Sequence, residues 1–172
     1  MPTPATQFLD QRLDNPFPGI AALERTLGRP ISSRLGGNEA LAQYPERWRA
    51  TYSDDFLTRC RQYQDPSAWS LRAALAEQLG VSAESLLVDA GADSLILLCL
   101  RAFSNFGDSV LCAAGTYPTF EYFARSLGLE VRRVPYRGEG AALELDLDAL
   151  LAEARRRPPK VLYLANPDNP TG

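Results

Sequence analysis

The sequence is 172 residues long, 45% hydrophobic and 23% charged, with a formal net charge of −3 at pH 7. This length suits one domain, or one domain plus an arm, and the slight acidic excess argues against a nucleic-acid partner. The sequence contains no histidine, which excludes histidine-dependent catalytic triads and the usual zinc ligand sets, so no metal site is expected.

No secretory signal or membrane span is expected. Residues 1–13 include Asp10 and lack a long apolar core, and the most apolar run, residues 95–100, is too short to cross a bilayer. The three cysteines form no Cys-x-x-Cys pair, and Cys99 and Cys112 lie in apolar runs typical of buried thiols. These features predict a cytoplasmic protein without a disulfide framework.

The first third of the chain is expected to be peripheral. Residues 1–34 are interrupted by five prolines and contain one short amphipathic segment, residues 20–27, so they are predicted to form an arm with one or two short helices. Gly36 and Gly37 follow and permit a turn before Asn38. Residues 45–62 are predicted to form a half-buried helix.

From residue 67 onward, strand and helix patterns alternate. Ser67 is expected to cap a helix over residues 68–79 that ends at Gly80. Short apolar runs predict strands over residues 86–90, 109–114, 129–135 and 160–165. Amphipathic segments between them predict helices over residues 92–105, 118–127 and 146–157. This alternation predicts right-handed βαβ units and an α/β, three-layer α-β-α fold with a largely parallel sheet.

The loop after the first predicted strand has the features of an anion site. It reads Gly91-Ala92-Asp93-Ser94 and leads directly into a helix, so the free N–H groups of the first turn could bind a phosphate where glycine allows close approach. The alternative is an ordinary turn in which Asp93 caps the helix. No Gly-x-Gly-x-x-Gly fingerprint follows any predicted strand, which weakens a dinucleotide-binding interpretation.

Two later strands are also followed by loops that could bind a ligand. Tyr117 could stack on an aromatic ligand, or simply contact the following helix, with Thr116 as the cap of that helix. The last loop reads Asn166-Pro167-Asp168-Asn169-Pro170-Thr171-Gly172. Its prolines restrict the backbone conformation of the residues before them, which makes the loop stiff. At the carboxyl end of a strand, such a loop could direct the amide of Asn169 toward a ligand.

The Asn-Pro-Asp-Asn-Pro-Thr-Gly run resembles the signature loop of the class I/II aminotransferases, which are pyridoxal-phosphate enzymes of fold type I. The resemblance extends over residues 34–172 and is strongest to the histidinol-phosphate aminotransferase branch. It implies that residues 1–34 are an N-terminal arm and that residues 35–172 are part of the pyridoxal-phosphate-binding large domain. A homodimer acting on small molecules, an amino donor and a 2-oxo acid acceptor, is also implied.

The resemblance also implies roles for individual residues. Gly91, Ala92, Asp93 and Ser94 would hold the cofactor phosphate, and Tyr117 would stack on the pyridine ring. Asn169 would donate a hydrogen bond to the ring hydroxyl oxygen. Tyr63, in a Tyr-Gln-Asp-Pro segment similar to the family's Tyr-Pro-Asp-Pro, would reach the cofactor phosphate of the neighbouring subunit. Asn38 would contact the substrate, although the residues after it depart from the family pattern.

In the family, the lysine that forms the Schiff base follows the signature loop, so no catalytic residue is assigned within residues 1–172. The expected function is transfer of an amino group between an amino acid or amino-alcohol phosphate and a 2-oxo acid, with this chain as an N-terminal fragment that is inactive alone. The alternatives are a related pyridoxal-phosphate-dependent decarboxylase and a non-catalytic α/β module that binds a phosphate ligand.

Overall fold

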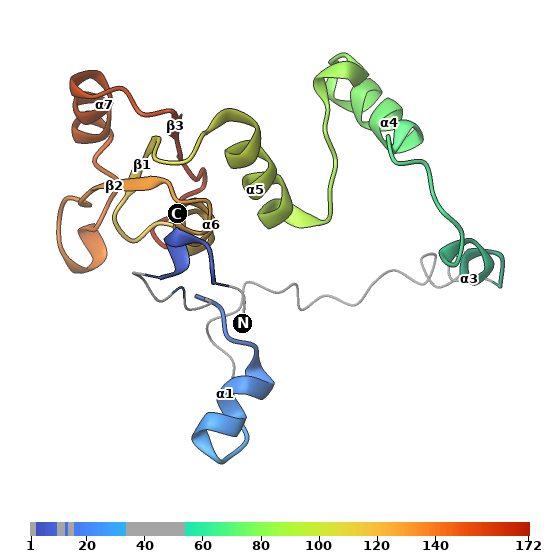
Figure 1. Ribbon diagram of the computed structural model, residues 1–172, viewed down its shortest axis with the longest axis horizontal. Helices are drawn as coiled ribbons and strands as arrows, with labels where there is room; N and C mark the ends of the chain where they lie inside the picture. Colours follow the sequence, from blue (N-terminus) through green and yellow to red (C-terminus); the bar gives the residue numbers. More distant parts are fainter. Residues whose placement is uncertain (1–2, 10–12, 14–15, 34–53) are drawn as a thin grey trace. The chain divides into compact units, whose positions relative to one another are not determined.

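The computed structural model describes residues 3–9, 13, 16–33 and 54–172. The chain divides into two compact units. One unit is Ile20–Val88, and the other joins Met1–Gly19 to Asp89–Gly172. Figure 1 shows the elements of both units.

Helices account for the regular structure described in the unit Ile20–Val88. They are α1 (Ile20–Leu27), α3 (Asp54–Cys60), α4 (Trp69–Leu79) and the 3-10 turn η2 (Ala83–Ser85). Helix α1 confirms the short amphipathic helix predicted over the same residues. Helix α3 lies within the helix predicted over residues 45–62, of which residues 45–53 lie outside the described part. Leu57 of α3 is 62% exposed, so the expected burial is not found at this position.

The start of α4 differs from the prediction. The Asp65 carboxylate, not the Ser67 hydroxyl, accepts the free backbone N–H groups, from Ser67 and from Trp69, each at 2.9 Å. The Ser67 hydroxyl donates to this same carboxylate at 2.7 Å. A carboxylate has two acceptor oxygens and can serve several donors at once, so Asp65 takes the capping role predicted for Ser67. The helix ends as predicted at Gly80, whose φ is +68°.

A small parallel sheet organises the second unit. Its strands are β1 (Ser109–Ala113), β2 (Glu130–Val134) and β3 (Val161–Leu162), in the order β2-β1-β3. Both pairings are parallel, with Val110 of β1 opposite Val131 of β2 and Val161 of β3. Backbone bonds extend the second pairing at both ends, since the N–H of Lys160 donates to Ser109 O and that of Tyr163 to Leu111 O.

The helices of this unit are α5 (Gly91–Phe103), α6 (Pro118–Ser126) and α7 (Leu147–Arg156), with the 3-10 turns η1 (Thr6–Phe8) and η3 (Gly140–Ala142). Pro118 is the first residue of α6, where its missing N–H costs nothing. Asp146 caps α7 by accepting the N–H of Ala149 at 2.9 Å. Since α6 connects β1 to β2 and α7 connects β2 to β3, the predicted βαβ units are confirmed.

Strand β1 is buried on both faces, as expected for the centre of a parallel sheet. On one face, Val110 and Cys112 pack with Leu100 of α5 and with Phe120 and Ala124 of α6. On the other face, Leu111 packs with Val134 of β2 and Leu150 of α7. These two clusters place α5 and α6 on one side of the sheet and α7 on the other, and Figure 1 shows the same layers. The predicted three-layer α/β fold is confirmed.

Two sequence predictions are wrong in part. Residues 86–90 form no strand, because no described strand pairs with them; an apolar run suits a strand but needs a neighbour to supply its hydrogen bonds. Cys99, expected in the core, is exposed on α5, while Cys112 is buried. The apolar run around Cys99 winds round a helix, so its residues cannot all face the sheet.

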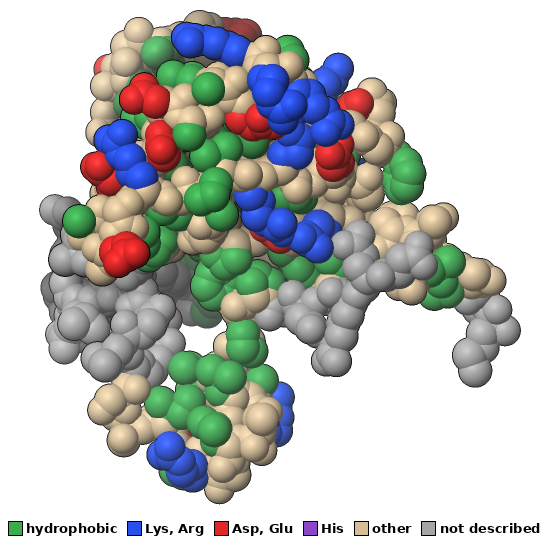
Figure 2. All heavy atoms as spheres, turned by 90° about the vertical axis from the view of Figure 1, so that its left-hand side faces the viewer, with side chains coloured by type: hydrophobic (Ala, Val, Ile, Leu, Met, Phe, Trp, Pro, Cys, Tyr) green, Lys and Arg blue, Asp and Glu red, His purple; other side chains and the backbone are tan. Residues whose placement is uncertain are grey.

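Ion pairs connect the edge strand β2 to a helix on each face. Arg132 pairs with Glu153 of α7, and Arg133, one residue later, pairs with Glu121 of α6. Successive strand residues point to opposite faces, which explains why neighbouring arginines reach different helices. On the face drawn in Figure 2, basic and acidic side chains lie close together among hydrophobic ones. Charged side chains on an edge strand also discourage pairing with another chain.

Candidate functional site

Helix α5 begins with an uncapped N-terminus at the predicted anion loop. Its N-cap residue, Ala90, makes no side-chain capping hydrogen bond, and the Ser94 hydroxyl donates backwards to Ala90 O at 3.1 Å. Gly91 has a φ of +86°, and a Cβ added there would meet no atom within 4 Å. The Gly91 N–H donates to Asp89 O at 2.9 Å, whereas no side chain caps the remaining first-turn N–H groups, so a phosphate could approach them beside Gly91.

Asp93 does not cap α5, so the alternative that the sequence left open is not found. Its carboxylate instead accepts the hydroxyl of Tyr117 at 2.9 Å. The neutral hydroxyl of Tyr117 thus stabilises the negative charge of Asp93. The bond also connects the start of α5 to the loop after β1. Asp93 and Tyr117, both predicted site residues, are thus brought together by the fold.

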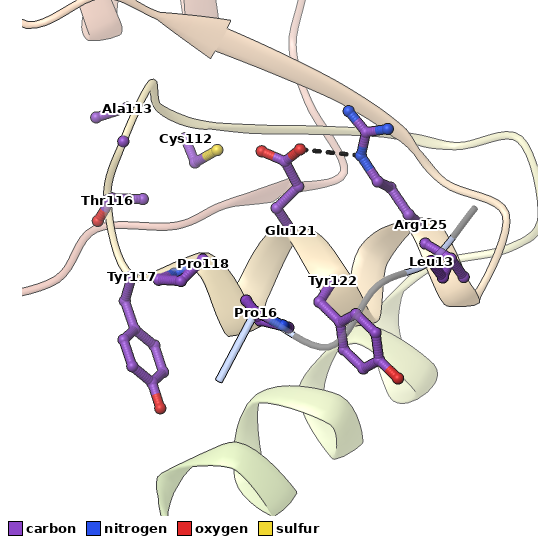
Figure 3. A pocket seen from close by; sticks show the side chains of 11 residues that line it. Leu13, Pro16, Cys112, Ala113, Thr116, Tyr117, Pro118, Glu121, Tyr122 and Arg125 are labelled. Carbon is purple, nitrogen blue, oxygen red and sulfur yellow. Dashed lines mark ion pairs between the residues drawn. The ribbon is translucent and has the colours of Figure 1, made fainter. Parts of the chain in front are cut away.

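Tyr117 lies at the turn between β1 and α6 and is half-buried. Tyr117, Cys112 and Glu121 line one hollow of about 390 Å³, in which Figure 3 shows the Tyr117 ring directed away from the other two side chains. The ring of Phe17 stacks against Tyr117 with 5.4 Å between centroids and 29° between planes. Sequence reasoning did not anticipate this contact, because Phe17 lies in the predicted N-terminal arm and belongs to no motif.

Thr116 is not the cap of α6, contrary to the second alternative considered for this loop. Helix α6 has no side-chain cap bond, and the Thr116 hydroxyl donates to Asp168 Oδ1 at 3.0 Å. The loops that follow β1 and β3 are therefore joined by a direct hydrogen bond. Since β1 and β3 are parallel neighbours, their carboxyl ends meet at the same edge of the sheet.

The loop after β3 places its two central residues in different environments. Asn169 is exposed, whereas Asp168 is half-buried. Both Asn-Pro bonds of the loop, Asn166-Pro167 and Asn169-Pro170, are cis. The Thr171 hydroxyl donates to Asp168 Oδ2 at 2.8 Å, and the N–H of Gly172 donates to Asp168 O at 2.8 Å, so the end of the loop folds back on Asp168.

Asp168 receives a third hydroxyl, that of Tyr136, which follows β2 and donates to Oδ2 at 2.7 Å. Burial opposes ionisation of Asp168, but the hydroxyls of Tyr136, Thr171 and Thr116 outweigh it and hold the pKa of this carboxyl below its usual value. Burial, with the nearby Asp168, raises the pKa of Tyr136 to about 12, so the phenol remains a donor. Neither residue was a predicted site residue; the position of Asp168 within the signature loop was the only signal.

Two predicted residues do not belong to the unit that contains this edge. Tyr63 belongs to the unit Ile20–Val88 and its side chain is fully exposed. Asn38 lies outside the described residues. Among those described, no group of three or more Cys, Asp or Glu side chains is arranged to hold a metal ion. In the same part of the chain, every helix is too short or too polar to cross a bilayer.

Residues 34–172 match the family model described as aminotransferase class I and II. The chain belongs to this family. Class I and II aminotransferases are also among its relatives of known structure. Histidinol-phosphate aminotransferase from Sinorhizobium meliloti, in complex with pyridoxal-5'-phosphate, superposes with a TM-score of 0.79 at 34% identity, over 96% of this chain and 42% of that one.

Other aminotransferases support the assignment. Histidinol-phosphate aminotransferase from Anaeromyxobacter sp. (strain Fw109-5) is 36% identical over 154 residues, which are 89% of this chain and 41% of the relative. N-Succinyldiaminopimelate aminotransferase from Mycobacterium tuberculosis has a TM-score of 0.69 at 26% identity, over 88% of this chain and 40% of that one. The chain thus spans about two fifths of the length of the relatives it matches.

Proposed function

We propose that this chain contributes part of the cofactor site of a pyridoxal-phosphate-dependent aminotransferase of the histidinol-phosphate type. The observation that carries the proposal is the convergence of three loops. The Tyr117–Asp93 bond joins the start of α5 to the loop after β1, and the Thr116–Asp168 bond joins that loop to the one after β3. Each loop carries a residue for which the sequence predicts a cofactor contact.

The residues at this edge fit the parts of the cofactor. The free N–H groups in the Gly91–Ser94 stretch would bind the phosphate, because no side chain caps this helix start, Gly91 leaves open space, and the Asp93 carboxylate is engaged by Tyr117. Tyr117 would supply an aromatic face for the pyridine ring, and the exposed amide of Asn169 a donor for its hydroxyl oxygen. When bound, pyridoxal phosphate supplies the electron sink that labilises bonds at the amino-bearing carbon.

The identity of the relatives favours an amino acid or amino-alcohol phosphate as the amino donor and a 2-oxo acid as the acceptor. In this proposal Asn38 contacts the substrate, Tyr63 serves the phosphate site of a neighbouring subunit, and the Schiff-base lysine follows residue 172. The enzyme would be a cytoplasmic homodimer, with residues 1–34 as an arm and residues 35–172 as part of the large domain.

The proposal is tested on the full-length protein that contains this chain. We expect it to bind pyridoxal phosphate and to form glutamate from 2-oxoglutarate when histidinol phosphate is the amino donor. A panel of other amino donors tests the substrate class. Release of carbon dioxide from an amino acid of this panel, without formation of glutamate, would instead indicate a decarboxylase. Cofactor binding with neither product would indicate a non-catalytic module, and absence of cofactor binding would refute the assignment of the site.

A further inference from the structure

The Asp168 carboxylate connects the loops that follow all three strands of the described sheet. Its donors are the hydroxyls of Thr116 after β1, Tyr136 after β2 and Thr171 of its own loop after β3, at 2.7 to 3.0 Å. An ionised carboxylate accepts only, and its two oxygens can take all of these donors at once. A single side chain thereby ties together segments that are up to 52 residues apart in sequence.

Packing around the turn after β1 reinforces this connection. Thr116 is only 8% exposed, so its hydroxyl depends on Asp168 as a partner in place of water. Gly115, next to it, has a φ of +105°, and a Cβ added there would lie 3.5 Å from Cε2 of Tyr136. The Tyr136 ring therefore lies against the turn while its hydroxyl reaches Asp168, which restricts the turn from two directions.

Asp168 and its donor Thr116 each stand beside a residue assigned to the cofactor ring. Thr116 immediately precedes Tyr117, and Asp168 immediately precedes Asn169. The Thr116–Asp168 bond therefore links the residue before Tyr117 to the residue before Asn169. The Tyr117 hydroxyl bonds to Asp93 at the start of α5, and the Thr116–Asp168 bond connects the neighbouring residue to the signature loop.

We propose that Asp168 is a positioning residue that, with Tyr136 and Thr116, sets the spacing between Tyr117 and Asn169 and so the orientation of the cofactor ring. This inference rests on the proposed function. Asp168 itself does not bind the ring: its carboxylate is turned toward the hydroxyls, while Asn169 is exposed. Charge-assisted hydrogen bonds of this kind suit a positioning role, because they are stronger and better aligned than neutral ones.

The test compares single-hydroxyl deletions in the full-length protein. Thr116→Val and Tyr136→Phe each remove one donor and keep the carboxylate and nearly the same volume, and Asp168→Asn replaces one acceptor oxygen by an amide. Tyr122→Phe is the matched control, because it removes the hydroxyl of a half-buried tyrosine on α6 that makes no bond to Asp168. Melting temperature is recorded for each variant without cofactor.

Two measurements separate positioning from simple stabilisation: the dissociation constant for pyridoxal phosphate, and the visible-region circular dichroism of the bound cofactor, which responds to ring orientation. We expect the three variants to bind about tenfold more weakly and to alter the circular dichroism band, with Tyr122→Phe matching the wild type. If Asp168→Asn does not fold, the two hydroxyl deletions decide the question.

Lower melting temperatures with unchanged affinity and an unchanged dichroism band would overturn the proposal, since the carboxylate would then only stabilise the fold. Failure of the wild type to bind pyridoxal phosphate would overturn both this inference and the proposed function. The two failures are distinguishable because the first leaves wild-type binding intact.

Discussion

At the scale of single residues, neighbours in the signature loop have opposite tasks. Asp168 turns toward the protein and accepts three hydroxyl hydrogen bonds, while Asn169 is exposed. The hydrogen bonds of Asp168 limit the motion of the loop next to Asn169. The Asn169 amide therefore loses less conformational freedom when it binds a ligand. The same division occurs before α6, where Thr116 is buried and Tyr117 is half-buried.

Gly91 gives a direct test of the phosphate site. Gly91→Val would place a β-branched side chain at a φ of +86° and fill the space in front of the helix start. We expect the affinity of the full-length protein for pyridoxal phosphate, measured by titration, to fall at least about tenfold. Gly140→Val is the control, since Gly140 also has positive φ and open space but lies in η3. Equal effects of the two substitutions would refute the assignment.

The three cysteines should differ in reactivity. Burial, together with the negative charge of Glu121, raises the pKa of Cys112 to about 11. At pH 8 only about one molecule in a thousand would carry the thiolate, which is the reactive form. Cys60 and Cys99 are exposed, so Ellman's reagent should modify two thiols of the folded protein rapidly and the third only after unfolding. Rapid modification of Cys112 would contradict its placement in the core.

At the scale of elements, every predicted cofactor contact within the described sheet unit follows a strand or begins a helix at one edge. Parallel strands require this arrangement, because each crossover returns the chain to the same starting edge. The loops then depend on the packing of the helices that follow them. Helix α7 is one such element, and it is held to β2 by the pair of Arg132 and Glu153.

This pair predicts a dependence of stability on pH. Hydrogen bonds from Arg156 and Arg132 lower the pKa of Glu153 from 4.5 to about 2. Because the folded-state pKa is lowered, the stabilisation is complete above pH 4.5 and is lost as the pH falls toward about 2. Glu153→Gln should therefore lower the urea midpoint at pH 7 and match the wild type near pH 2. An exposed glutamate of α4, replaced as Glu77→Gln, should have little effect at either pH.

Lys160 should not bond covalently to the cofactor. It is the only lysine of the sequence, and its N–H pairs with Ser109 at the amino end of β1, opposite the loops that carry Tyr117 and Asn169. At about 3.3 Å per residue it lies roughly 16 Å from the end of residues 160–165, and its side chain spans about 6 Å. Borohydride reduction of the 172-residue chain with pyridoxal phosphate, followed by peptide mapping, should show no stoichiometric label there. A full label competed by cofactor analogues would contradict this placement.

At the scale of the whole molecule, the chain matches about two fifths of each relative, and its described residues form two units. The unit with the sheet contains the predicted phosphate and ring contacts. Tyr63 belongs to the other unit, and its side chain is fully exposed, as the proposed contact with a neighbouring subunit requires. A site shared between subunits is a common consequence of two-fold symmetry.

Subunit mixing tests the role of Tyr63 in the full-length enzyme. Tyr63→Ala and Asn169→Ala should each be nearly inactive, but a hybrid dimer would contain one site free of both substitutions if Tyr63 serves its neighbour. Random exchange should then restore about one quarter of wild-type activity, since half the dimers are hybrids with one intact site each. Proven exchange without recovery would place Tyr63 in its own subunit's site or outside any site.

The sequence by itself determined the fold class, the order of elements along residues 109–162 and the family. These predictions rest on local properties: hydrophobic periodicity, the positions of glycine and proline, and the signature loop. Such patterns can be recognised without knowing which segments pack together in the fold. Gly80 ending α4 and Pro118 beginning α6 are examples, because each acts through its own backbone.

Only the tertiary structure decided which side chains meet. Residues 86–90 have the pattern of a strand yet lack a described partner, and Asp93 and Thr116, plausible as helix caps, instead bond to Tyr117 and Asp168. A polar side chain can bond to any donor or acceptor that folding brings within about 3 Å. Many of these groups come from segments that are distant in the sequence and compete with the local backbone. For this reason the role of Asp168 in joining three loops could not be predicted from the sequence and became clear only in the fold.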